Sequence, residues 1–218
     1  MRDSRSRLLL TGLLLLMLGA GLYTGSVVKR HNDSQPVTLT RELPQLQQAL
    51  ADSHWVSPGI AGGRAIYMVS FRSCPYCVQY ETLEFPRLQK AGVDTRAILV
   101  ARTDENGAAR STPAERATVA ELWRTRDWRL YQHWTEVPVD AWGASADVPP
   151  SADADPGRRA AVEAGRAAVA RLAGLLHDNG VDLHYPTLIW KTADGRWRSF
   201  VGYDAAAAAT IRTELGAS

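Results

Sequence analysis

The chain has 218 residues, 45% of them hydrophobic and 22% charged, which favours one globular domain with appendages and excludes collagen-like and disordered proteins. Two cysteines are too few for a disulfide scaffold. The formal net charge of +2 is unevenly placed: residues 1–30 hold five basic residues and one acidic residue, leaving 20 basic and 22 acidic residues in 31–218, so nucleic-acid binding is not expected.

An uncharged, Leu-rich stretch of 21 residues, Leu8–Val28, follows three arginines at the N-terminus. About 20 apolar residues span a bilayer core, and basic residues before them favour export of the chain that follows. We therefore predict that residues 1–30 are a signal anchor or a cleaved signal peptide, with the uncleaved anchor favoured. Either one places residues 31–218 in an oxidising compartment.

The first half of the chain carries the pattern of a strand–helix–strand unit. From hydrophobic spacing we expect a polar spacer over 31–40, a linker helix over 42–53 capped by Thr40, a buried strand over 65–71, a helix over 78–91 and a second strand over 95–101. Pro86 predicts a kink in the second of these helices. The two cysteines lie at the junction of the first strand and this helix.

The second half of the chain is expected to be helical and then to end in a hairpin. We predict a helix over 113–135, a loop over 143–157, a helix over 158–177, strands over 187–191 and 197–202, and a last helix over 205–215. Asp194-Gly195 between the two strands is a strong hairpin signal. The tryptophans of the helical part are expected to pack it onto the sheet, or else to form an exposed patch for substrates; they are Trp123, Trp128, Trp134 and Trp142.

The motif Cys74-Pro75-Tyr76-Cys77 carries the chemistry. A cysteine at a helix start faces free backbone N–H groups and the positive end of the helix dipole, and the pKa of such a thiol falls from about 8.5 to between about 3.5 and 7.5. Thiolate is the nucleophile of disulfide exchange. Cys77, one turn later, can close a disulfide with Cys74 or resolve a mixed disulfide formed there. Pro75 suits the first helical turn.

The cysteine pair could also be part of a zinc site or a passive structural disulfide. A zinc site needs four ligands, but no second CxxC is present and the five histidines are scattered, so no metal is expected. A passive structural disulfide would close a very short loop and stabilise little.

With these residues the chain resembles the thioredoxin fold. The strand, Cys-Pro-Tyr-Cys, helix, strand, helical excursion, Tyr185-Pro186-Thr187, hairpin and terminal helix follow its order. Within that fold the chain looks most like the catalytic domain of the DsbC/DsbG disulfide isomerases, in four stretches: 49–59, 65–77, 118–134 and 179–203. The resemblance implies an α/β domain over 59–218. It would have a central mixed sheet flanked by helices and a helical insertion at about 104–180, preceded by the spacer and linker helix of 31–58.

The resemblance also implies roles for six residues. Cys74 would be the exposed attacking thiol and Cys77 the buried resolver, while Pro75 and Tyr76 tune the pair. Pro186 would be a cis-proline beside the disulfide, and Tyr185 would offer backbone hydrogen bonds to an extended substrate segment. Tyr185 departs from the small threonine usual in these isomerases.

The implied activity is periplasmic thiol-disulfide exchange with protein substrates, without a cofactor. A membrane redox partner would recycle the pair, and Leu8–Val28 could anchor the protein in the inner membrane. The family's N-terminal dimerisation domain does not fit between the leader and Arg41, so oxidation and reduction are as plausible as isomerisation. The alternative from another class is a non-catalytic thioredoxin-fold binding module or chaperone-like component of an envelope assembly.

Overall fold

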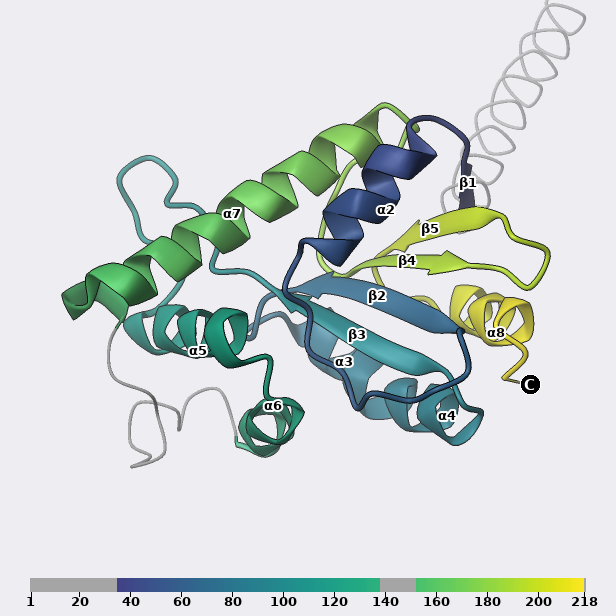
Figure 1. Cartoon of the computed structure of the whole chain (residues 1–218), viewed down its shortest axis with the longest axis horizontal. Helices are drawn as coiled ribbons and strands as arrows, with labels where there is room; N and C mark the ends of the chain where they lie inside the picture. The colour runs from purple at the N-terminus through teal and green to yellow at the C-terminus, as the bar shows by residue number, and fades with distance from the viewer. Residues whose placement is uncertain (1–34, 138–151, 218) are drawn as a thin grey trace, which may run out of the picture. The chain divides into compact units, whose positions relative to one another are not determined.

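A five-stranded mixed sheet forms the centre of the computed structural model, which describes residues 35–137 and 152–217. The strands lie in the order β1 (Val37–Leu39), β5 (Trp197–Val201), β4 (Thr187–Lys191), β2 (Ala65–Ser70) and β3 (Asp94–Leu99). β2 and β3 pair in parallel, and every other neighbouring pair is antiparallel (Figure 1). The expected mixed sheet is confirmed. The leader, 1–30, lies outside the described residues.

The central strand β2 is buried on both faces, which explains its unbroken apolar sequence. Because side chains alternate along a strand, Tyr67 and Val69 join one core cluster, while Ile66 and Met68 join the other. Helices must therefore cover both faces of the sheet.

Two groups of helices provide this cover. Buried side chains of α2 (Leu43–Ala51), α5 (Pro113–Thr125), α6 (Trp128–Glu136) and α7 (Pro156–His177) belong to the first cluster. Those of α3 (Pro75–Leu83), α4 (Phe85–Lys90) and α8 (Ala205–Glu214) belong to the second. Figure 1 shows α2 and α7 side by side. The expected helical insertion comprises α5, α6, the short 3-10 helix η2 (Ala152–Ala154) and α7.

The start of the described chain differs from the expectation. Val37–Leu39, within the expected polar spacer, forms β1 and pairs with β5, and Leu39 is buried. Thr40 is not a helix cap: α2 begins after Glu42, whose backbone is left-handed with φ 51° and whose side chain makes no capping hydrogen bond. The backbone N–H of Thr40 instead donates to Asn179 Oδ1 at 2.7 Å. A contact so distant in sequence leaves no local pattern.

Two of the expected helices are interrupted. Pro86 lies in the first turn of α4, so the helix expected over 78–91 divides into α3 and α4 at Glu84. The helix expected over 113–135 ends at Arg126, which adopts φ 53°. Asp127 then starts α6 by accepting the backbone N–H groups of Arg129 and Leu130. Both breaks have local causes, a proline and an N-cap aspartate.

The tryptophans of the insertion pack into the protein as expected. Trp123 and Trp134 are 5% and 4% exposed, and Trp128 is partly buried against the same cluster. The indole N–H of Trp123 donates to the carbonyl of Leu99 at 2.7 Å, which joins α5 to the end of β3. Trp142 lies outside the described residues.

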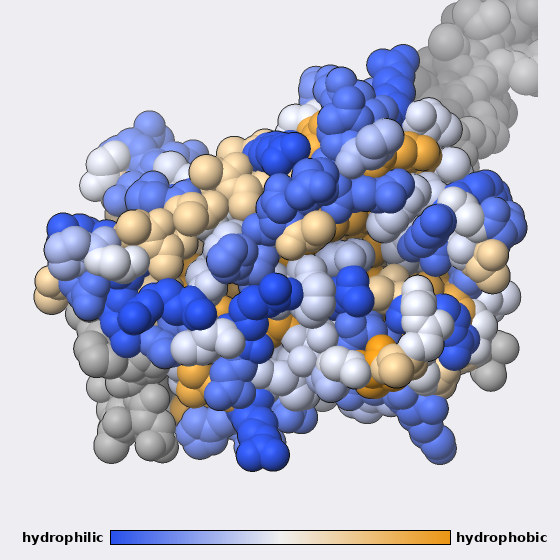
Figure 2. Space-filling model, viewed as in Figure 1, coloured by the Kyte–Doolittle hydropathy of each residue, from blue (hydrophilic) through white to orange (hydrophobic). Residues whose placement is uncertain are grey.

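The described surface is largely polar. On the face drawn in Figure 2, hydrophilic residues cover most of the molecule and hydrophobic ones show only in separate patches. Within 35–137 and 152–217, no helix is long and apolar enough to cross a bilayer.

Candidate active site

The cysteine motif lies where β2 leads into α3. Cys74 is the N-cap of α3, with an extended backbone of φ −80° and ψ 113°, and its Sγ accepts the backbone N–H of Cys77 at 3.2 Å. Pro75 occupies the first helical turn, where its missing N–H costs no hydrogen bond. Cys74 and Cys77 form a disulfide, with Cα atoms 5.2 Å apart. The sulfur of Cys74 is therefore at the positive end of a helix, as the motif predicted.

Both cysteines are buried in this oxidised state. Cys74 is 3% exposed and Cys77 is 1% exposed, so the structure differs from the expectation of an exposed attacking cysteine. The sulfur of Cys74 lies against the first turn of α3, where it accepts the backbone N–H of Cys77. The exposed part of the motif is instead Pro75 and Tyr76, and Tyr76 is 60% exposed.

The Tyr185–Pro186 loop leads into β4, which pairs with β2, the strand that precedes the motif. Its peptide bond is cis, the isomer that the resemblance implied. Pro186 is buried and leads into β4, whose Thr187 pairs with Val69 near the end of β2. The Tyr185 ring contacts that of Phe71 edge-on, with 5.0 Å between centroids. Burial raises the pKa of the Tyr185 hydroxyl, while the charge of Arg102 lowers it.

A buried carboxylate from the helical insertion holds the residue before Cys74. Glu115, 2% exposed, accepts the backbone N–H of Ser73 at 2.9 Å and also the Ser73 hydroxyl. Its other oxygen accepts the backbone N–H of Thr112 at 2.9 Å within a capping box. The spacing Thr112-x-x-Glu115 signals a helix start, but nothing in the sequence indicates the contact with Ser73.

A second buried charge, Arg72, also joins the motif to the insertion. Its guanidinium donates to the carbonyls of Trp134 and, at 3.1 Å, Val137. Burial lowers the pKa of Arg72, an effect opposed by nearby Glu81, Tyr131 and Glu115. Sequence reasoning missed this residue because arginine beside a motif usually indicates a solvated surface.

Glu81 lies one helical turn beyond Cys77 on α3. Burial raises the pKa of its carboxyl to about 7, although the Tyr131 hydroxyl and the Arg72 charge lower it. Burial and the negative charge of Glu81 raise the pKa of Tyr131 in turn. Residues four apart share one face of a helix, so the spacing of Glu81 from Cys77 is the signal that could have identified it from the sequence.

Within the described part of the chain, no cluster of three or more histidine, cysteine, aspartate or glutamate side chains could hold a metal ion.

Comparisons with known proteins identify the fold. No family model matches the sequence, and no curated protein matches it. A periplasmic thioredoxin-like protein from Salmonella enterica serovar Typhimurium is similar in structure, with a TM-score of 0.52 and 14% identity over 81% of this chain and 99% of that chain. The thiol-disulfide exchange protein alpha-DsbA2 from Wolbachia pipientis gives a TM-score of 0.51 and 13% identity, covering 80% and 92%. The chain has a thioredoxin-like fold with a helical insertion.

Proposed function

We propose that the protein is a thiol-disulfide oxidoreductase that exchanges disulfides with protein substrates through Cys74 and Cys77. The observation that carries this proposal is the Cys74–Cys77 disulfide at the N-terminus of α3. A thiolate at that position is stabilised by the helix dipole and by free N–H groups, so it is both a nucleophile and a good leaving group. The fold shared with thiol-disulfide exchange proteins adds support.

In the oxidising direction a substrate thiolate attacks Cys74 Sγ. The new sulfur–sulfur bond joins the substrate to Cys74, the Cys74–Cys77 bond breaks, and its electron pair leaves on Cys77, which then takes up a proton. A second substrate thiolate attacks the substrate sulfur of this mixed disulfide. A substrate disulfide forms, Cys74 leaves as thiolate, and two electrons have passed to the protein. The reverse sequence reduces a substrate.

Four neighbouring residues are assigned supporting roles. Pro75 and Tyr76 tune the pair from the first turn of α3, and Tyr76 is exposed where a substrate would approach. Tyr185 contacts Phe71, three residues before Cys74, and we assign Tyr185 and Pro186 the binding of an extended substrate segment next to Cys74.

The compartment, the partners and the direction of exchange belong to the same proposal. We place the protein in the periplasm, with residues 1–30 as signal anchor or signal peptide. The thioredoxin-like domain, expected over 59–218, also includes β1 and α2, because β1 pairs with β5 and buried side chains of α2 belong to the first core cluster. A membrane protein that carries its own dithiol or disulfide would recycle the pair. Isomerase activity of the DsbC/DsbG kind stays a prediction, as does the resemblance to those catalytic domains.

Two cysteine variants test the proposal. Cys77→Ser should accumulate a mixed disulfide when it is mixed with a peptide that carries a disulfide, because Cys74 attacks that disulfide, one peptide sulfur leaves as thiolate, and the resolving thiol is gone. Mass spectrometry detects the mixed disulfide. Cys74→Ser should form none. If Cys74→Ser still acts on substrates, the exchange mechanism is wrong, and the non-catalytic binding module takes its place.

The reduction potential decides the direction. Equilibration of the pair in glutathione buffers should give between about −120 and −180 mV for an oxidant or isomerase and about −270 mV for a reductant. A pair that stays reduced at every glutathione ratio would contradict both directions.

A further inference from the structure

A cavity of about 520 Å³ adjoins the active-site loop. Arg102, in the segment after β3, and Tyr185, directly before Pro186, are among the residues that line it, and α7 forms another wall through Val169 and Gly174. Tyr185 also contacts Phe71, which lies three residues before Cys74. A substrate segment bound beside Tyr185 therefore extends past the mouth of this cavity.

Arg102 is held in place without using its hydrogen-bond donors. The guanidinium carbon lies 4.0 Å from the centroid of the Phe71 ring. Its Nε is buried and has no hydrogen-bond partner, and within residues 35–137 and 152–217 the side chain forms no ion pair. The backbone of Arg102 is held by two hydrogen bonds: its N–H donates to the Ser111 hydroxyl, and its carbonyl accepts from the Arg166 guanidinium. A stacked arginine with unused donors is suited to an incoming anion.

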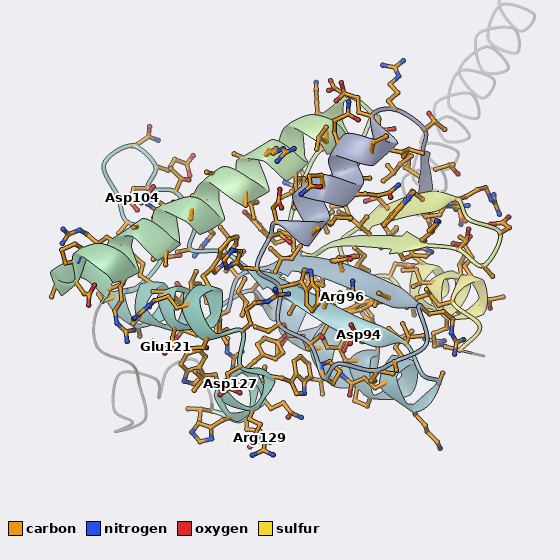
Figure 3. All side chains as sticks on the ribbon, in the orientation of Figure 1. Asp94, Arg96, Asp104, Glu121, Asp127 and Arg129 are labelled. Atoms are coloured by element: carbon orange, nitrogen blue, oxygen red, sulfur yellow. A yellow bond between two sulfur atoms is a disulfide. The ribbon has the colours of Figure 1, made fainter. Side chains whose placement is uncertain are left out.

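The other charged groups that line the cavity have partners. Arg166 pairs with Glu163 at 2.8 Å and lies 3.6 Å from Asp104, which Figure 3 shows on the loop beside α7. His177 and Asp182 contact each other at 2.9 Å. Among the described residues, the one lining charge left without a counter-ion is therefore that of Arg102.

We propose that this cavity binds an acidic side chain of the protein substrate, with its carboxylate on Arg102, so that the enzyme selects substrates with Asp or Glu close to the reacting cysteine. The inference rests on the proposed function and assigns its substrate class. A carboxylate fits because it accepts two parallel N–H groups from one guanidinium. The aliphatic part of Glu would contact the apolar wall formed by Val100, Val169 and Leu183.

The test compares the rates at which peptides reduce the Cys74–Cys77 disulfide of the full-length protein. Three peptides carry a single cysteine flanked on both sides by two Glu, two Gln or two Lys residues. Acid quenching and mass spectrometry follow the mixed disulfide. We expect the wild type to react about tenfold faster with the Glu peptide than with the Gln peptide, because one charge-assisted hydrogen bond corresponds to a rate factor of about that size. The Lys peptide should react more slowly than the Gln peptide.

Arg102→Gln should reduce the Glu-to-Gln rate ratio to about one, since the donor geometry and charge are removed. Arg171→Gln is the matched control, because Arg171 is on α7, 51% exposed, and pairs with Asp52 outside the cavity. It removes the same charge and should keep the wild-type ratio. If the Glu-to-Gln rate ratio falls to about one in both variants, the preference comes from long-range charge, and the proposal is overturned.

The wild-type series is decisive even if Arg102→Gln fails to fold. Equal rates with the Glu and Gln peptides overturn the acidic-substrate inference, whereas the proposed function survives because both peptides still exchange. If no peptide forms a mixed disulfide, and dithiothreitol also leaves the pair unreduced, both the inference and the proposed function are wrong.

Discussion

Replacing Glu81 by Gln should stabilise the protein at neutral pH. Burial raises the pKa of Glu81 from 4.5 to about 7, so the folded state holds its proton more tightly than the unfolded state does. The stability linked to this proton is fully present below about pH 4.5 and is lost as pH rises through about 7. At 1.36 kcal/mol per pKa unit, the free energy of unfolding gained by the substitution is at most about 3 kcal/mol. Because the residue keeps some solvent exposure, we expect about 1–3 kcal/mol.

Denaturant unfolding of the oxidised protein between pH 4.5 and 8 measures this difference. Wild type and Glu81→Gln should have similar free energies of unfolding near pH 4.5, where both side chains are neutral, and the variant should gain the advantage as pH rises. Glu163→Gln, at a side chain 66% exposed, is the matched control and should follow the wild type. Parallel curves for wild type and Glu81→Gln across the whole range would refute the assignment of a buried, titrating carboxyl.

Three further predictions concern the helical insertion. Glu115→Gln replaces the carboxylate that accepts the Ser73 backbone N–H and hydroxyl. The free energy of unfolding should fall by about 1–3 kcal/mol, and peptides should reduce the Cys74–Cys77 disulfide more slowly. Unchanged values in both assays would contradict the support role. Gly165→Val should destabilise by about 1–3 kcal/mol, because a Cβ there would lie 3.0 Å from the Trp123 ring. Gly174→Ala, with no atom within 4 Å of its Cβ, should gain about 0.5–1 kcal/mol by denaturant unfolding, and a loss there would refute the steric argument.

Local signals predicted most of the elements. β4 has the bounds expected for it, 187–191, and Asp204 caps α8 by accepting the N–H groups of Ala206 and Ala207. The Asp194-Gly195 turn joins β4 to β5 as expected, with Gly195 at φ 88°. In each case the determining residues lie within a few positions of the element, so periodicity and caps contain the information.

What the sequence did not predict depends on distant partners. β1 has three residues, of which only Leu39 is buried, too short a run to show alternation. It is held by pairing with Trp197 and its neighbours on β5, at the other end of the chain. The cysteine pair was identifiable from spacing alone, but Arg102 was not. Arg102 stacks on Phe71 and lines the same cavity as Tyr185, an arrangement that brings three separate segments together.

The helical insertion contacts the candidate active site as well as the sheet. Arg72 and Ser73, the two residues directly before Cys74, both contact it: Arg72 through carbonyls at the end of α6, Ser73 through Glu115 on α5. These contacts hold the backbone directly before Cys74. Substitutions in the insertion should thus alter exchange rates without touching either cysteine, because the geometry of an N-capping sulfur depends on the residues that precede it.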